Sequence, residues 1–359
     1  MTIMTTKTYN LISILILTAL TSGCAQESKP DEKKDKVHTT HVFYPVLKDT
    51  MDLYAKSKGV FLSDNTNDPA LRYIDTGLIM YNKFKFDEAI FFYTKSIKVK
   101  PYSHAYSNRA NARLAVRDTV NALQDYNDAI KADSTNSSPF FNRGNLFTAQ
   151  KKYTEALTDY NDALKAWAIS KNYTGVPLSD IFINRGNLLF YLNDLNSSIK
   201  DYSEALKSDP KNLMAFANRA EAKNKLRDFQ GAIEDYSKAI SINEDPEFFF
   251  KRAMNYINLQ KFQEAIPDLD KTIKLNPTIW DAYYIRAQAK GRLKNYNAAI
   301  ADIDKMIELQ PNNAEGYFMR GLTYSAYLQN SEKGCPDLKK ALDLGDKRAA
   351  ALIRDYCPK

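Results

Sequence analysis

Glycine, histidine and cysteine are scarce in this chain of 359 residues, which contains twelve, three and three of them. No glycine-rich phosphate loop occurs, and we find neither a nucleophile–base set nor a pair of carboxylates on a rigid strand. His38 and His41 lie in a polar stretch and form at best a weak metal-binding pair. We therefore expect a protein that is not an enzyme and that has no cofactor and no metal.

The chain also lacks a strong excess of charge of either sign. It has 50 basic and 43 acidic residues, a net charge of +7. Basicity this dilute is weak evidence for nucleic-acid binding, and we expect no nucleic-acid partner. The hydrophobic fraction is 44% and the charged fraction 26%, as in globular proteins, and helix formers dominate. An all-α fold follows.

Long hydrophobic runs are absent apart from LISILILTAL at residues 11–20. This run is too short to span a bilayer but matches the apolar region of a signal peptide. The next residues, LTSGC, resemble the lipobox of bacterial lipoproteins, although Thr21 stands where that family has a large aliphatic residue. The resemblance implies a signal peptide at 1–23, lipidation of Cys24, and an exported protein anchored in the cell envelope, in the outer membrane. The alternative is an ordinary secretory peptide with an incidental cysteine.

A polar segment follows the cysteine. Residues 24–41 include AQESKPDEKKDK, which cannot bury enough apolar surface to fold, so we predict a flexible tether. Residues 42–69 are predicted to form a helical lead-in and a loop. These segments would separate the anchor from the folded domain.

A repeat with a period near 34 covers residues 70–344. Its clearest marker is a small residue, spaced at intervals of 33, 34, 42, 34, 33, 34 and 35, at Ala89, Ala122, Ala156, Ser198, Ala232, Ala265, Ala299 and Gly334. The longest interval contains an insertion near 166–177. Each unit shows two amphipathic helical patterns, and several units end at a proline. Each unit is therefore predicted to be a hairpin of two antiparallel helices that stacks on its neighbours.

Within each unit, small residues at positions 8 and 20, tyrosine at position 24 and proline at position 32 resemble the tetratricopeptide repeat. The resemblance implies a right-handed α-solenoid of about eight hairpins, with residues 345–359 as a capping helix. It also implies a concave face, lined by the first helix of each hairpin, that binds peptides or partner proteins.

Two charged positions vary together. Arginine at position 7 and aspartate at position 23 occur in the same seven units, and the first unit has Thr76 and Phe92 instead. We predict an ion pair within each hairpin, with ligand binding by the arginines as the alternative. The spacing is 16 residues except in the last unit, where it is 17 and we expect a longer turn. The pairs are Arg109 with Asp125, Arg143 with Asp159, Arg185 with Asp201, Arg219 with Asp235, Arg252 with Asp268, Arg286 with Asp302, and Arg320 with Asp337.

A row of asparagines follows the predicted concave face at positions 6 and 9, which lie three residues apart on one helix face. An asparagine amide both donates and accepts hydrogen bonds, and such a row resembles the asparagine ladder with which some tetratricopeptide superhelices hold extended peptides. Bonding to the backbone of the neighbouring repeat is the alternative. The residues are Asn108, Asn142, Asn184 and Asn218 at position 6, and Asn111, Asn145 and Asn187 at position 9.

Later units have an aromatic residue at position 5, at Phe250, Tyr284 and Phe318. Exposed aromatics mark partner sites, and packing between repeats is the alternative. The basic clamp of chaperone-binding repeats needs lysine at this position. The first units have Ile74 and Ser107 there, so we exclude that clamp.

The last two cysteines flank a predicted turn at Gly345, which lies ten residues after Cys335 and twelve before Cys357. The two cysteines would meet if the flanking helices were antiparallel, and an exported protein enters an oxidising compartment. We predict a Cys335–Cys357 disulfide, with free thiols as the alternative.

Together these features predict a non-enzymatic, membrane-anchored scaffold. It would bind an unidentified protein or extended peptide in its concave groove, in envelope assembly, secretion or uptake. The alternatives are an enzyme that uses the insertion, or an RNA-binding helical-repeat protein.

Overall fold

The computed structural model describes residues 68–170 and 175–358, which form seventeen α helices and one short π-helix but no strand. The predicted signal peptide, the lipidation site Cys24, the tether and most of the lead-in lie outside the described residues. None of the helices in the described ranges is both long and apolar enough to cross a membrane.

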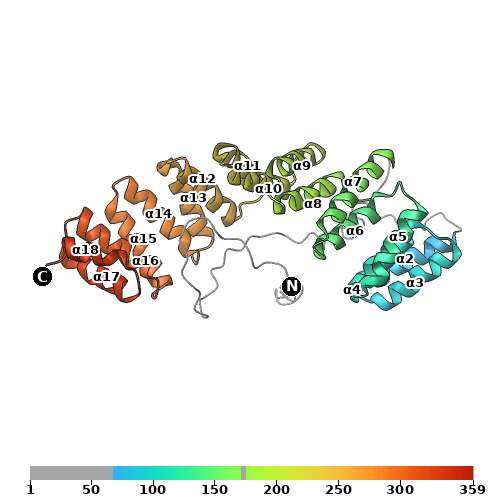
Figure 1. Ribbon diagram of the computed structural model, residues 1–359, viewed down its shortest axis with the longest axis horizontal. Coiled ribbons are helices and arrows are strands. Elements are labelled where there is room, and N and C mark those ends of the chain that lie inside the picture. Colours follow the sequence, from blue (N-terminus) through green and yellow to red (C-terminus); the bar gives the residue numbers. More distant parts are fainter. Residues whose placement is uncertain (1–67, 171–174, 359) are drawn as a thin grey trace, which may run out of the picture. The chain divides into compact units, whose positions relative to one another are not determined.

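Sixteen of the helices form eight antiparallel hairpins, and each hairpin packs against the next along the chain (Figure 1). The hairpins are α2 (Pro69–Asn82) with α3 (Phe86–Val99), α4 (Ser103–Ala115) with α5 (Thr119–Ala132), α6 (Ser137–Ala149) with α7 (Tyr153–Ser170), α8 (Leu178–Tyr191) with α9 (Leu195–Ser208), α10 (Leu213–Lys225) with α11 (Phe229–Ile242), α12 (Pro246–Asn258) with α13 (Phe262–Leu275), α14 (Trp280–Arg292) with α15 (Tyr296–Leu309), and α16 (Ala314–Leu322) with α17 (Ser331–Asp343). This is the α-solenoid that the repeat period predicts, because each hairpin buries its apolar faces only against its neighbours.

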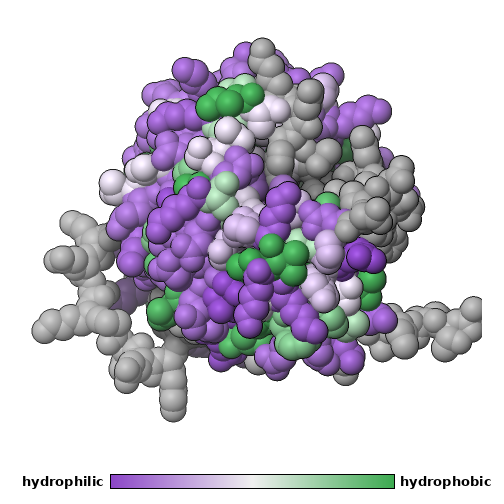
Figure 2. Space-filling view, turned by 90° about the vertical axis from the view of Figure 1, so that its right-hand side faces the viewer, coloured by the Kyte–Doolittle hydropathy of each residue, from purple (hydrophilic) through white to green (hydrophobic). Residues whose placement is uncertain are grey.

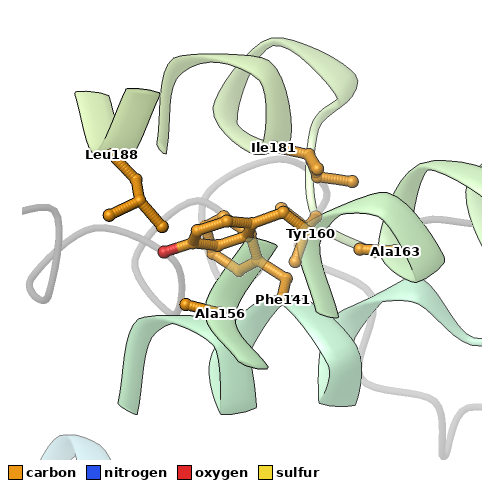
Figure 3. Close-up of a cluster of buried hydrophobic side chains, with 7 residues drawn as sticks. Phe141, Ala156, Tyr160, Ala163, Ile181 and Leu188 are labelled. Carbon is orange, nitrogen blue, oxygen red and sulfur yellow. The ribbon is translucent and has the colours of Figure 1, made fainter. Parts of the chain in front are cut away.

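Small residues at position 8 set the separation of the two helices in a hairpin. A Cβ atom on Gly186 would lie 2.8 Å from the ring of Tyr202, so the tyrosine occupies the space that a side chain would need. The equivalent tyrosines are among the most deeply buried side chains. Leu188 and Ile181 of α8, in the fourth hairpin, belong to the same buried cluster as Tyr160 and Phe141 of the third hairpin, so one cluster joins two hairpins (Figure 3).

The turn inside every hairpin contains one residue with positive φ, and none of these eight residues is glycine. They are Phe84, Arg117, Lys151, Asn193, Arg227, Gln260, Lys294 and Gln329, with φ between 54° and 65°. A side chain in this left-handed region costs about 1–2 kcal/mol relative to the right-handed one. These positions could not be predicted from the sequence, because glycine, the residue that most often marks a positive φ, occupies none of them.

The insertion near residues 166–177 begins as helix. It extends α7 to 18 residues, so that Ala166 is buried and Trp167 packs against the neighbouring core cluster. Val176, just before α8, is buried in the same cluster. The described part of the insertion therefore adds to the core between the third and fourth hairpins.

The last hairpin differs from the prediction of a longer turn. Its turn, Leu328–Asn330, has the usual three residues, and the extra residue is accommodated by the π-helix η1 (Thr323–Tyr327) at the end of α16. A π-helical turn absorbs one residue without breaking the helix. The Arg320–Asp337 spacing of 17 therefore has its origin in the helix and not in the loop.

The final helix, α18 (Arg348–Tyr356), covers the apolar face of the last hairpin. Gly345, with φ of 98°, makes the turn before it. Leu352 and Ile353 pack against Leu338 in one cluster. Cys335 and Cys357 are joined by a disulfide, with 5.8 Å between their Cα atoms, which ties the end of α18 to α17.

Candidate partner-binding face

The first helices of successive hairpins lie side by side. Contacts join α2 to α4, α4 to α6, α6 to α8, α8 to α10, and α12 to α14. We call the surface that these helices present the first-helix face. The predicted groove residues at positions 5, 6 and 9 belong to these helices, so their contacts within the solenoid decide which of them remain available for a ligand.

All seven predicted arginine–aspartate pairs are in contact, and each is bidentate. The arginine Nε donates to one carboxylate oxygen and Nη2 to the other, at 2.6–3.0 Å. The aspartate side chains are nearly fully buried, and the arginines are mostly buried. Such a pair holds the two helices of one hairpin in register.

The third guanidinium nitrogen of every arginine reaches the preceding hairpin. Nη1 donates at 2.5–3.1 Å to a side-chain oxygen at position 25 of that hairpin. The acceptors are Thr94, Asn127, Asn161, Ser203, Ser237, Asp270 and Asp304. These arginines therefore join hairpins to each other as well as helices within a hairpin, a role that sequence reasoning missed.

Each guanidinium also lies over an aromatic ring at position 4 of its own helix, with its central carbon 5.6–5.9 Å from the ring centroid. The rings belong to Tyr106, Phe140, Phe182, Phe216, Phe249, Tyr283 and Tyr317. An aromatic residue at position 4 of every unit was a signal available in the sequence. All three nitrogens of each guanidinium donate to acceptors of the chain, and one face of the group lies over a ring. We conclude that these arginines stabilise the solenoid and do not bind a ligand.

The side-chain oxygen of each asparagine at position 9 accepts a hydrogen bond from a tyrosine of its own hairpin, a contact that the sequence analysis did not predict. Asn111 accepts a hydrogen bond from Tyr126 at 2.5 Å, Asn145 from Tyr160 at 2.7 Å, and Asn187 from Tyr202 at 2.9 Å. Each tyrosine is at position 24 of the same hairpin. The reason is that burial of a tyrosine ring requires a partner for its hydroxyl group.

This pairing changes along the chain. In the fifth hairpin Glu221 replaces the asparagine and accepts from Tyr236 at 2.8 Å. In the last three hairpins position 24 is aliphatic, at Leu269, Ile303 and Leu338, and no tyrosine needs an acceptor. The loss of asparagine and glutamate from position 9 after the fifth unit therefore coincides with the loss of tyrosine from position 24.

The first hairpin breaks this pattern, because it keeps Tyr93 but has Leu78 at position 9. The buried Tyr93 hydroxyl has no hydrogen-bond partner among the described residues. Burial raises the pKa of Tyr93 far above its ordinary value, which reflects the same lack of compensation.

The asparagines at position 6 fall into two groups. Asn184 donates to the backbone of Asp180 in its own helix, and Asn218 donates to Asn187 of the preceding hairpin, both at 2.8 Å. Asn108 and Asn142, on the adjacent helices α4 and α6, are half-buried and form no side-chain hydrogen bond within the described part of the chain. Asn108 and Asn142 are thus the two asparagines of the predicted row that form no side-chain hydrogen bond among the described residues.

The position 5 aromatics are partly buried. Phe250 and Tyr284 pack against the cluster around Leu269. Phe318 packs against the capping region, and the guanidinium of Arg348 lies 4.2 Å from its ring centroid. Part of each of these three side chains is therefore buried by packing within the solenoid. The ring of Phe318 is also covered by α18.

Within residues 68–170 and 175–358, no three histidine, cysteine, aspartate or glutamate side chains gather closely enough to hold a metal ion.

Exposed hydrophobic residues are scattered over the surface that Figure 2 shows. Seen from the side on which α2 to α5 lie in Figure 1, this surface is mostly hydrophilic with small separate apolar groups (Figure 2).

A family model for the tetratricopeptide repeat matches residues 103–169, 183–246 and 250–314, more than half of the chain. Among solved structures, the chain is similar to pilF of Pseudomonas aeruginosa, with a TM-score of 0.52 and 16% identity, over 62% of this chain and 98% of that one. It is also similar to YrrB, described as a TPR protein with an unusual peptide-binding site (TM-score 0.47, 23% identity, 54% and 97% coverage), and to MamA (0.45, 24%, 48% and 94%). A sequence search of curated proteins found no match. Identities this low bear on the fold alone.

Proposed function

The chain belongs to the tetratricopeptide repeat family, and from this we propose that it is a non-enzymatic scaffold that binds an extended protein or peptide segment on its first-helix face. We further propose that it is exported and held at the bacterial outer membrane by a lipid on Cys24, and that it serves envelope assembly, secretion or uptake. A tetratricopeptide solenoid is suited to protein–protein interaction.

The observation that carries the binding proposal is the pair of available amides at Asn108 and Asn142. Most other polar side chains of the predicted row are engaged inside the solenoid. An amide that is half-buried and has no partner loses solvent contacts without compensation. It gains the most from a ligand backbone, to which it both donates and accepts.

Two features support export. The lipobox-like sequence ends at Cys24, and the other two cysteines are joined in a disulfide, the form that persists outside the reducing cytoplasm.

The binding proposal is tested by placing a photo-crosslinking amino acid at position 108 or 142 of the full-length protein in its native membranes. We expect both positions to capture the same protein. The matched control is position 297, because Asn297 is exposed on the second helix α15. Equal capture at 297, or none at 108 and 142, would contradict the proposal.

The anchor is tested separately by Cys24→Ala. We expect this variant to lose metabolic labelling by a palmitate analogue and to leave the membrane fraction, while Cys357→Ala keeps both properties. Retention of the label after Cys24→Ala would exclude Cys24 as the lipidation site.

A further inference from the structure

Three first helices carry an acidic residue at position 2 followed by an aromatic residue at position 5. Residues three apart lie on the same helix face, so each helix presents a carboxylate beside a ring. The pairs are Glu247 with Phe250 on α12, Asp281 with Tyr284 on α14, and Glu315 with Phe318 on α16.

One of these pairs already binds an arginine of the chain. Arg348, from α18, forms a salt bridge with Glu315, and its guanidinium lies 4.2 Å from the centroid of the Phe318 ring. The arginine combines a charge-assisted hydrogen bond with a cation–π contact. The arrangement on α16 therefore shows how a carboxylate and a ring at these positions hold a basic side chain.

The carboxylate of a second pair, Glu247 with Phe250, is neutralised by a lysine of the same helix. Lys251, one residue after Phe250, lies 3.3 Å from Glu247 and 3.3 Å from Glu221 of the preceding hairpin. The carboxylates of α12 and α16 therefore each have a cation from the chain itself.

Asp281 is different, because no cation of the described residues forms an ion pair or hydrogen bond with it. It is half-buried, and burial raises the pKa of its carboxyl group. The ring of Tyr284 follows it, and the Trp280 ring lies 6.2 Å from that of Tyr284. A carboxylate that is partly desolvated without a cation is costly for the folded state.

We propose that Asp281 and Tyr284 bind an arginine side chain of the partner segment, in the way that Glu315 and Phe318 bind Arg348. Phe250 and Met254 on the adjacent helix α12 are partly buried apolar residues that would contact an apolar side chain next to that arginine. The partner is then an extended peptide in which an arginine is flanked by an apolar residue. This inference rests on the proposed peptide-binding function and specifies its ligand.

The arginine site and the more general proposal of peptide binding can be tested separately. A phage-displayed library of random dodecapeptides is selected in parallel on the native protein and on Asp281→Asn. We expect arginine to be enriched beside an apolar residue on the native protein and this enrichment to disappear on the variant. Enriched peptides without a basic residue, or the same arginine preference on Asp281→Asn, would overturn the arginine site and leave peptide binding intact. No enrichment of any sequence would contradict both.

A selected peptide and its copy with citrulline in place of arginine then measure the charge effect by fluorescence anisotropy. We expect the arginine peptide to bind the native protein about tenfold more tightly, less so in high salt, and both peptides to bind Asp281→Asn equally. Asp343→Asn, which removes an exposed aspartate of α17, should keep the tenfold preference. Equal binding of the two peptides to the native protein would refute the site.

Discussion

Replacing Arg185 alone should destabilise the protein more than replacing Arg185 and its partner Asp201 together. Asp201 is the clearest target, because its side chain is only 3% exposed and Arg185 is its one cationic partner in the described ranges. By contrast, Asp125, Asp235 and Asp302 each have a second basic neighbour.

The magnitude follows from these contacts. Arg185→Met leaves a buried carboxylate without compensation, which costs about 3–5 kcal/mol. It also removes the hydrogen bond to Asn161 and the contact with Phe182, whose ring centroid is 5.7 Å away. Arg185→Met with Asp201→Leu loses the same contacts but leaves no buried charge, and it adds apolar surface to the core. We expect the double variant to lose about 1–2 kcal/mol, which is about 2 kcal/mol less than the single variant.

Repeat arrays need not unfold in one step, so the measurement is amide hydrogen exchange in α8 and α9 of the full-length protein, which reports the free energy of local opening. Arg292→Met, at an exposed arginine on α14, is the control and should change this free energy little. If the single variant loses no more stability than the double variant, Arg185 does not stabilise the hairpin by compensating the buried charge of Asp201.

Three further predictions test the turn, the tyrosine row and the carboxylate of α14. Arg227→Gly should stabilise the fifth hairpin by about 0.5 kcal/mol in hydrogen exchange because it relieves a positive φ, whereas Arg227→Ala should not. Tyr93→Phe should leave the urea midpoint unchanged or raise it, whereas Tyr126→Phe should lower stability by about 1 kcal/mol through loss of its bond to Asn111. Because burial raises the pKa of Asp281, its contribution to stability is present below the unfolded pKa and is lost as the pH rises through the folded pKa. Asp281→Asn should therefore match the native protein in urea titrations at pH 3 and exceed it at pH 7.

The repeat architecture was accessible from the sequence because it depends on local, periodic features. Small residues at positions 8 and 20 permit close helix packing, and their period sets the number and length of the hairpins. The pairing of arginine with aspartate was also accessible, because both partners lie in one hairpin and their spacing is set by two helices and one turn. Where the helix itself changes, as at η1, the same spacing argument misplaced the extra residue.

Hydrogen-bond partners, by contrast, were decided by the tertiary structure. Positions 6 and 9 share a helix face, and the sequence alone could not tell that Asn145 accepts a hydrogen bond from Tyr160 while Asn142 forms no side-chain hydrogen bond among the described residues. Whether an amide contacts a tyrosine hydroxyl, and whether that hydroxyl is buried, depends on the distance between two helices. The periodicity of the sequence does not contain this distance.

The same reason explains what the sequence determined about the candidate site and what it did not. It determined which helices line the first-helix face and which residue types lie there. The packing of successive hairpins decided that every paired arginine contacts its aspartate, an acceptor on the preceding hairpin and an aromatic ring. It also decided that Arg348 of α18 pairs with Glu315, whereas Asp281 has no such cation among the described residues. Availability for a ligand depends on what neighbouring repeats have already satisfied, and that is a property of the stacked solenoid.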